Sequence, residues 1–163
     1  MIKRMIEPLI RQDFGKGKVV LVLGARQVGK TTLLQQLSAE VRKPILLNCD
    51  NADDRALLAN PTTTSLVALV GDADFLLIDA AQRVEGIGLA LKMLADAVGT
   101  HTQVVATGSS ALELANGVFE SAAGRVFEYR LYPFSTCHRI LYHIYSPNST
   151  LIGRIYYPNS TQI

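Results

Sequence analysis

Short apolar runs alternate along the chain with longer segments in which apolar residues recur every three or four positions. The short runs are rich in Val, Ile and Leu and are bounded by Gly, Pro or polar residues, which is typical of buried strands. The longer segments have the spacing of amphipathic helices. Strands are therefore expected at Lys18–Leu23, Ile45–Leu47, Phe75–Ile78, Gln103–Thr107 and Val126–Leu131.

The helical segments lie before and between these strands. Strands that alternate with helices form βαβ units, whose strands are parallel and whose helices cover both faces of the sheet. The pattern thus predicts an α/β fold, with a mostly parallel central sheet in a three-layer sandwich. Helices are expected at Met1–Phe14, Lys30–Arg42, Arg55–Ala59, Ser65–Val70 and Ile87–Val98, and from about Ala111.

The last part of the chain departs from this alternation. Residues 144–150 (IYSPNST) recur almost unchanged as residues 155–161 (IYYPNST), and no acidic residue follows Glu128. Two copies are too few for a solenoid, and the Pro-Asn-Ser punctuation favours loops. We interpret residues 137–163 as an atypical, repeat-containing tail that is poorly ordered. An edge hairpin that docks on the sheet is the alternative.

Composition narrows the class of protein. At 163 residues, with 48% hydrophobic and 18% charged residues, the chain has enough apolar material for one folded domain. A net charge of +2 gives no clear nucleic-acid signal. No apolar run approaches the roughly 18 residues of a membrane span. Cys49 and Cys137 form no disulfide framework and the first residues do not resemble a signal peptide, so a cytoplasmic location is expected.

One motif carries specific chemistry. Residues 24–31 match the pattern G-x-x-x-x-G-K-[ST] at every fixed position, between an expected strand and an expected helix. The two glycines let the backbone wrap a phosphate, and the helix N-terminus adds a positive end. A nucleotide is therefore expected to bind at Gly24, Ala25, Arg26, Gln27, Val28, Gly29, Lys30, Thr31 and Thr32.

Two side chains of this loop and one carboxylate further along have individual roles. Lys30 is expected to reach the β- and γ-phosphates and to assist catalysis, and the Thr31 hydroxyl is expected to bind Mg²⁺. A P-loop also needs an acidic residue at the end of a neighbouring strand to hold the metal. The apolar run Phe75–Ile78 ends in Asp79, so the expected Mg²⁺ ligands are Thr31 and Asp79.

The position after this carboxylate bears on hydrolysis. Many ATPases of this type have Glu there, which polarises the attacking water, but this chain has Ala80. Glu85 is close in sequence, yet it lies beyond the strand end. We therefore expect nucleotide binding with absent or impaired hydrolysis. The alternatives are an active P-loop NTPase that uses another base, and a non-enzymatic interaction module that is switched by nucleotide.

Four blocks of sequence together resemble a known family. They are residues 24–34 (GARQVGKTTLL), 75–83 (FLLIDAAQR), 107–114 (TGSSALEL) and 124–135 (GRVFEYRLYPFS). In this order they are similar to a prokaryotic family of AAA-type P-loop ATPases, whose AAA domain is usually followed by a C-terminal domain of unknown function. The resemblance implies that residues 1–136 form a P-loop AAA-type domain, which binds ATP or ADP with Mg²⁺.

The resemblance also implies a RecA/AAA-like sheet of the type with an additional strand, and it suggests roles for three more residues. Thr107 or Ser109, at the end of the fourth strand, would be a sensor near the γ-phosphate. Arg125 would be an arginine finger for a neighbouring subunit. From the residues alone, Thr107 and Ser109 are also consistent with strand-end caps, and Arg125 with a solvated arginine at a strand edge.

The chain departs from this family in two respects. The family has Asp-Glu-Ala-Gln where this chain has Asp-Ala-Ala-Gln at residues 79–82, which removes the expected catalytic carboxylate. The family also continues well beyond the block that ends at Ser135, so the chain resembles a truncated member without the lid and the C-terminal domain. Because those parts usually contribute interface area, a monomer or a weak homo-oligomer is expected.

Overall fold

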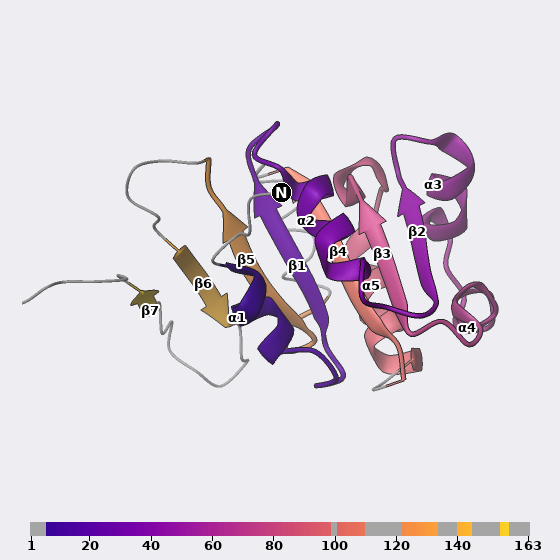
Figure 1. The fold of residues 1–163 in the computed structure, drawn as a ribbon. Coiled ribbons are helices and arrows are strands. Elements are labelled where there is room, and N and C mark those ends of the chain that lie inside the picture. Colours follow the sequence, from indigo (N-terminus) through magenta and orange to yellow (C-terminus); the bar gives the residue numbers. More distant parts are fainter. Residues whose placement is uncertain (1–5, 99–100, 110–121, 134–139, 145–153, 157–163) are drawn as a thin grey trace, which may run out of the picture.

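The computed structural model describes residues 6–98, 101–109, 122–133, 140–144 and 154–156, with only the backbone course in the last two ranges. Its centre is a sheet of seven strands in the order β2-β3-β4-β1-β5-β6-β7 (Figure 1). The first five strands in this order are parallel, and all five lie where the sequence pattern predicted strands. They are β1 (Val19–Gly24), β2 (Pro44–Asn48), β3 (Phe75–Asp79), β4 (Gln103–Ser109) and β5 (Val126–Leu131).

The strand that leads into the P-loop motif lies inside the sheet. Every residue of β1 is buried, because β4 and β5 flank it and helices cover both of its faces. Strand β4 lies between β1 and β3, so the strand that ends in Asp79 is not adjacent to β1. This inserted strand is the additional strand that the family resemblance implied.

Helices cover both faces of the sheet, which confirms the predicted three-layer α/β sandwich (Figure 1). Helices α1 and α2 pack on one face with Val20 and Val22 of β1, and α3, α4 and α5 pack on the other with Leu21 and Leu23. In the part of the chain that the structure describes, no helix is long and apolar enough to cross a membrane. The helices are α1 (Ile6–Gln12), α2 (Lys30–Ser38), α3 (Ala52–Ala59), α4 (Thr63–Val70), the 3₁₀ turn η1 (Ala81–Arg83) and α5 (Ile87–Val98).

Two helix ends show how local sequence sets the boundaries. Thr62 and Ser65 form a capping box at the start of α4, in which each hydroxyl accepts the backbone N–H of the other at 3.0 Å. Helix α2 was predicted to reach Arg42 but ends at Ser38. The residues between α2 and β2 are mostly charged and present no apolar face that the sheet could bury, so the helix stops there.

Two antiparallel strands extend the sheet beyond β5. Strand β6 (Ile140–Ile144) pairs with β5, and β7 (Arg154–Tyr156) pairs with β6. This is the position that an edge hairpin, the alternative interpretation of the tail, would take. The poor order expected for the other tail residues, and the helix expected from about Ala111, concern residues outside the described ranges.

Candidate nucleotide-binding site

Three chain segments meet at one edge of the sheet. Because β1, β3 and β4 are parallel, their carboxyl ends lie on the same side, which is where open α/β sheets bind ligands. The P-loop motif follows β1, a turn into η1 follows β3, and β4 ends at Ser109. Ser109 is opposite Gly24 in the ladder, so β4 brings its last residue to the start of the P-loop.

The P-loop backbone requires its glycines. Gly29, the residue before α2, has a φ of 90°, which glycine adopts without a steric cost. A Cβ at Gly24 would lie 2.5 Å from the backbone oxygen of Leu131 and 2.9 Å from a methyl carbon of Val28. These constraints explain why glycine occupies both fixed positions. Of the other motif residues, Ala25, Arg26, Gln27, Thr31 and Thr32 are exposed and Val28 is buried.

The first turn of α2 offers backbone donors to an anion. The first hydrogen bond to the residue four positions earlier joins the Leu33 N–H to the Gly29 oxygen at 3.0 Å. The N–H groups of Lys30, Thr31 and Thr32 precede that bond, and the helix itself does not use them. Together with the positive end of the helix dipole, they form a site suited to a phosphate group.

Lys30 lies over the loop that precedes it. Its Nζ donates to the carbonyl oxygens of Gly24 at 2.9 Å and Ala25 at 2.7 Å. Partial burial lowers the pKa of Lys30 below its ordinary value, while the nearby carboxylate of Asp79 acts in the opposite direction. The ammonium group is thus held at the mouth of the loop, within electrostatic reach of Asp79.

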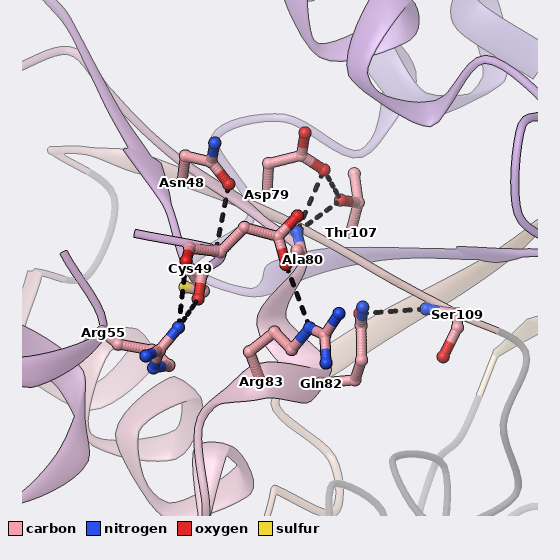
Figure 2. Close-up of polar contacts among 10 residues, drawn as sticks. Asn48, Cys49, Arg55, Asp79, Ala80, Gln82, Arg83, Thr107 and Ser109 are labelled. Atoms are coloured by element: carbon pink, nitrogen blue, oxygen red, sulfur yellow. Dashed lines mark hydrogen bonds and ion pairs between the residues drawn. The ribbon is translucent and has the colours of Figure 1, made fainter. Parts of the chain in front are cut away.

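Asp79 links the three segments. Its Oδ2 accepts the Thr31 hydroxyl at 2.6 Å, and its Oδ1 accepts the Thr107 hydroxyl and, at 3.0 Å, the N–H of Ala80. Thr107 is fully buried, and its oxygen also accepts the Ala80 N–H at 3.3 Å (Figure 2). The structure therefore joins Thr31, Asp79 and Thr107 by hydrogen bonds, with Lys30 within electrostatic reach of Asp79.

The pair formed by Thr31 and Asp79 has the chemistry of a Mg²⁺ site. Both groups are oxygen donors, which Mg²⁺ prefers, and Mg²⁺ usually takes only one or two protein ligands beside phosphates and water. Among the described residues, no group of three or more His, Cys, Asp or Glu side chains could hold a metal ion. Thr31 and Asp79 together fit a Mg²⁺ ion that is shared with a nucleotide, because they would supply the one or two protein oxygens that such an ion takes.

The turn after Asp79 has a methyl group where the family resemblance implies a carboxylate. Ala80 has a φ of 55°, in the left-handed region, and its N–H is bound by the side chains of Asp79 and Thr107. Glu85, considered as a replacement base, is exposed and lies beyond η1. The backbone at Ala80 is therefore well fixed, but its side chain provides no general base.

Two residues of η1 form side-chain bonds beside the site, and sequence reasoning gave neither of them a role. Oε1 of Gln82 accepts the N–H of Ser109 at 3.1 Å (Figure 2). Nε of Arg83 donates to Oδ1 of Asp50 at 2.9 Å. Arg55 donates to the carbonyl oxygen of Asp50 at 3.1 Å. The signal that could have found Gln82 and Arg83 is their place in the block of residues 75–83.

Cys49 lies beneath this edge of the sheet. It is fully buried, and its N–H donates to the carbonyl oxygen of Asp79 at 2.9 Å. Burial raises the pKa of the Cys49 thiol to about 11, and the carboxylates of Asp54 and Asp79 add to the shift. The thiol therefore stays protonated near neutral pH and contributes packing rather than nucleophilic chemistry.

Arg125 immediately precedes β5, so it lies at the amino-terminal ends of the parallel strands, opposite the ends that carry the P-loop and Asp79. Its carbonyl oxygen accepts the N–H of Val19, the first residue of β1, at 2.9 Å, and β1 spans about 20 Å from there to the P-loop. Its Nε is 2.5 Å from Oδ1 of Asp96 on α5. The structure therefore does not bring Arg125 to the P-loop of its own chain, and a role toward a neighbouring subunit stays a prediction.

The sequence of the chain is similar to those of known proteins. A family described as an AAA domain matches residues 16–138. Uncharacterised proteins of Mycobacterium tuberculosis and Mycobacterium bovis are each 32% identical to the chain over 117 residues, which is 72% of this chain and 25% of theirs. The chain thus spans about a quarter of the length of these curated relatives.

Solved structures are similar to the chain in fold. A KaiC-like protein of Pyrococcus horikoshii has a TM-score of 0.54 at 19% identity, with 96% of this chain and 91% of that chain covered. A Walker-type ATPase of Pyrococcus abyssi has a TM-score of 0.55 at 18% identity, with 83% and 55% covered. Drosophila ORC bound to DNA has a TM-score of 0.54 at 14% identity, with 80% and 91% covered.

Three findings agree on the class of protein. The P-loop has the glycine geometry that its motif requires, and Thr31 of the loop is hydrogen-bonded to Asp79 at the end of β3. Strand β4 is inserted between β1 and β3, and the solved structures share the fold of P-loop NTPases. The family match covers most of the chain. The chain therefore belongs to the AAA domain family of P-loop ATPases.

Proposed function

We propose that the chain binds ATP and ADP with Mg²⁺ at the P-loop and hydrolyses ATP very slowly or not at all. One contrast within the site carries this proposal: Lys30 and the Thr31–Asp79 pair are in place, but Ala80 follows with only a methyl group. General acid–base assistance typically contributes about 10²- to 10⁴-fold to a rate. Its loss slows the chemical step and leaves nucleotide binding intact.

The residues of the site bind and orient the nucleotide. The N–H groups at the start of α2 and the Lys30 ammonium bind its phosphates. Thr31 and Asp79 hold Mg²⁺ through their oxygens, and the ion, when bound, neutralises charge on the phosphate oxygens. Thr107, which is bonded to Asp79, and Ser109, which is opposite Gly24, are the proposed γ-phosphate sensors.

Other carboxylates near this edge are poorly suited to replace the missing base. Asp54 accepts the N–H of Asn48 at 2.8 Å, and Asp50 is paired with Arg83. Glu85 is exposed beyond η1. A general base must lie within hydrogen-bond reach of the water that it activates. An active NTPase that uses another base is therefore the less favoured alternative.

Further properties are proposed from the family and the composition rather than from the site. We propose that the chain binds ATP rather than GTP, because the members of the family that it resembles are ATPases. The P-loop itself contacts only phosphates and does not distinguish the two bases. A cytoplasmic location and a monomer or weak homo-oligomer are proposed as well. The nucleotide is the proposed ligand. Since Drosophila ORC, which is similar in fold alone, was solved bound to DNA, binding experiments should include DNA as a control.

Nucleotide titration combined with a phosphate-release measurement tests the proposal. Calorimetry should show binding of Mg-ATP and Mg-ADP by the wild type, while phosphate release stays near background. Ala80→Glu should raise turnover by about 10²-fold, whereas Ala80→Gln, which has the same size without a base, should not. Wild-type turnover of about 1 per second or faster would reveal another base. A wild type that binds neither nucleotide would overturn the binding assignment.

A further inference from the structure

The last residues of β4 have a backbone partner on one side only. The ladder between β3 and β4 ends at the pair Ile78–Ala106, whereas the ladder between β1 and β4 continues to the pair Gly24–Ser109. Beyond Ala106, the position of β4 on the β3 side therefore depends on side chains.

Side chains of the turn between β3 and η1 take over this role. Thr107 is bonded to the carboxylate of Asp79 and to the N–H of Ala80. Two residues later, the N–H of Ser109 donates to Oε1 of Gln82 at 3.1 Å (Figure 2). Gln82 thereby fixes the end of β4 at the point where that strand is opposite the first glycine of the P-loop.

We propose that Gln82 is a positioning residue that acts through Ser109, holding the end of β4 beside the P-loop and thereby strengthening the binding of ATP relative to ADP. This inference rests on the proposed function, in which Ser109 lies on the γ-phosphate side of the site. Only ATP has a γ-phosphate, so a displacement of Ser109 weakens the binding of ATP and leaves the contacts of ADP in place. The amide oxygen of Gln82 acts on the strand and not on the nucleotide.

The turn itself does not depend on the Gln82 bond for its fold. Ala81 is fully buried against the sheet. Backbone bonds from Arg83 to Ala80 at 3.0 Å and from Val84 to Ala81 at 3.1 Å close the turn. Removal of the glutamine acceptor should therefore release the end of β4 without unfolding η1.

A matched pair of variants on this turn tests the inference. Gln82→Met keeps the length of the side chain and removes the acceptor, while Arg83→Met removes the exposed ion pair with Asp50 instead. Calorimetry with Mg²⁺ compares a non-hydrolysable ATP analogue with ADP. Gln82→Met should weaken analogue binding by about 2- to 10-fold, the value of one hydrogen bond, and leave ADP binding unchanged. Arg83→Met should leave the ratio of the two affinities unchanged. An equal effect of Gln82→Met on both nucleotides, or no effect, would overturn the inference.

A measurement on the wild type covers the case in which Gln82→Met does not fold. In NMR spectra, the Ser109 amide should be protected from solvent exchange, and its chemical shift should respond more to the ATP analogue than to ADP. The same shift with both nucleotides would overturn the role of Gln82.

The two proposals fail in different ways. Rapid phosphate release by the wild type would contradict slow hydrolysis and leave the affinity ratio of Gln82→Met as a valid test. An unchanged ratio would contradict the role of Gln82 alone. A wild type that binds neither nucleotide would overturn both.

Discussion

Two turns leave the same edge of the sheet, and they differ in how much of their chemistry is present. The turn after β1 has both glycines of the motif, Lys30 and Thr31, in an arrangement that suits a phosphate. The turn after β3 has Asp79, bonded to Thr31 and Thr107, and then the methyl group of Ala80. In the proposed function, the phosphate-binding groups and the group for water activation belong to separate turns, so one set can be complete while the other is not.

The backbones of the two turns are more alike than their side chains. Each contains a residue other than glycine in the left-handed region, Gln27 with a φ of 65° and Ala80 with a φ of 55°. Such a conformation costs about 1–2 kcal/mol and persists where other contacts fix it. At Ala80 those contacts are hydrogen bonds to Asp79 and Thr107. The second turn therefore keeps a defined shape although it has no base.

The largest effect is expected from the binding turn. Lys30→Ala removes the ammonium group at the mouth of the loop. It should weaken Mg-ATP and Mg-ADP binding by about 10- to 100-fold, because a hydrogen bond to a charged group is worth about 1.5–3 kcal/mol. Lys43→Ala removes an exposed lysine that is paired with Asp72, and it should change neither affinity. Calorimetry that finds equal binding by Lys30→Ala and the wild type would contradict the P-loop assignment.

A smaller effect is expected at Asp79, which belongs to the second turn but serves the first through Thr31. Asp79→Asn keeps the shape of the side chain and removes its charge. It should weaken nucleotide binding by about tenfold in the presence of Mg²⁺ and have little effect in EDTA. Asp74→Asn, an exposed position at the other end of β3, is the control. Equal losses with and without Mg²⁺ would mean that the carboxylate supports the fold of the site rather than the metal.

The bounds of strands and helices were predictable where the local pattern of apolar residues runs through the whole element. Strand Val126–Leu131 and helix Ile87–Val98 have the predicted bounds, because their alternation and their helical period run through to both ends. The end of α2 at Ser38 was not predictable in this way. A run of charged residues is compatible with an exposed helix, and only the packing shows where the buried face stops.

For the candidate site too, features that depend on neighbouring residues could be predicted, whereas bonds between distant residues could not. The motif and the apolar strand before Asp79 are local signals, so the P-loop and its carboxylate could be found from the sequence. The bond of Gln82 with Ser109 joins residues 27 positions apart, and that of Arg125 with Asp96 joins residues 29 positions apart. Nothing near these residues in the sequence marks either bond.

The shape of the second turn can be tested apart from its chemistry. Ala80→Gly should stabilise the protein by about 0.5–1 kcal/mol, because glycine adopts a positive φ without the steric cost of alanine. Phosphate release should stay near background. Ala56→Gly, at an exposed position within α3, should instead destabilise by about 1 kcal/mol. Denaturant unfolding measures both changes. A loss of stability in Ala80→Gly would mean that packing of the methyl group outweighs the backbone strain.

The smallest effect on nucleotide binding is expected from Arg125, at the amino-terminal ends of the parallel strands. Arg125→Ala should change the Kd for Mg-ATP by less than about twofold, because β1 separates Arg125 from its own P-loop by about 20 Å. The free energy of unfolding should fall by only about 0–1 kcal/mol, since the side chains of Arg125 and Asp96 are 41% and 50% exposed. Asp96→Ala breaks the same ion pair and should give the same result.

Arg125 could act on a nucleotide only if copies of the chain assemble, so that it serves as an arginine finger for a neighbouring subunit. Arg125 would have to leave Asp96 and meet the nucleotide of a neighbouring subunit, and a stable contact of that kind needs about 1,000 Å² or more of buried surface. In line with the proposed monomer or weak homo-oligomer, we expect sedimentation with ATP and Mg²⁺ to show a monomer or a weak dimer. Arg125→Ala should sediment in the same way. A tight ring that forms with ATP and is lost in Arg125→Ala would contradict this expectation. It would add Arg125 to the hydrolysis machinery, which would then lie on two subunits rather than on one turn.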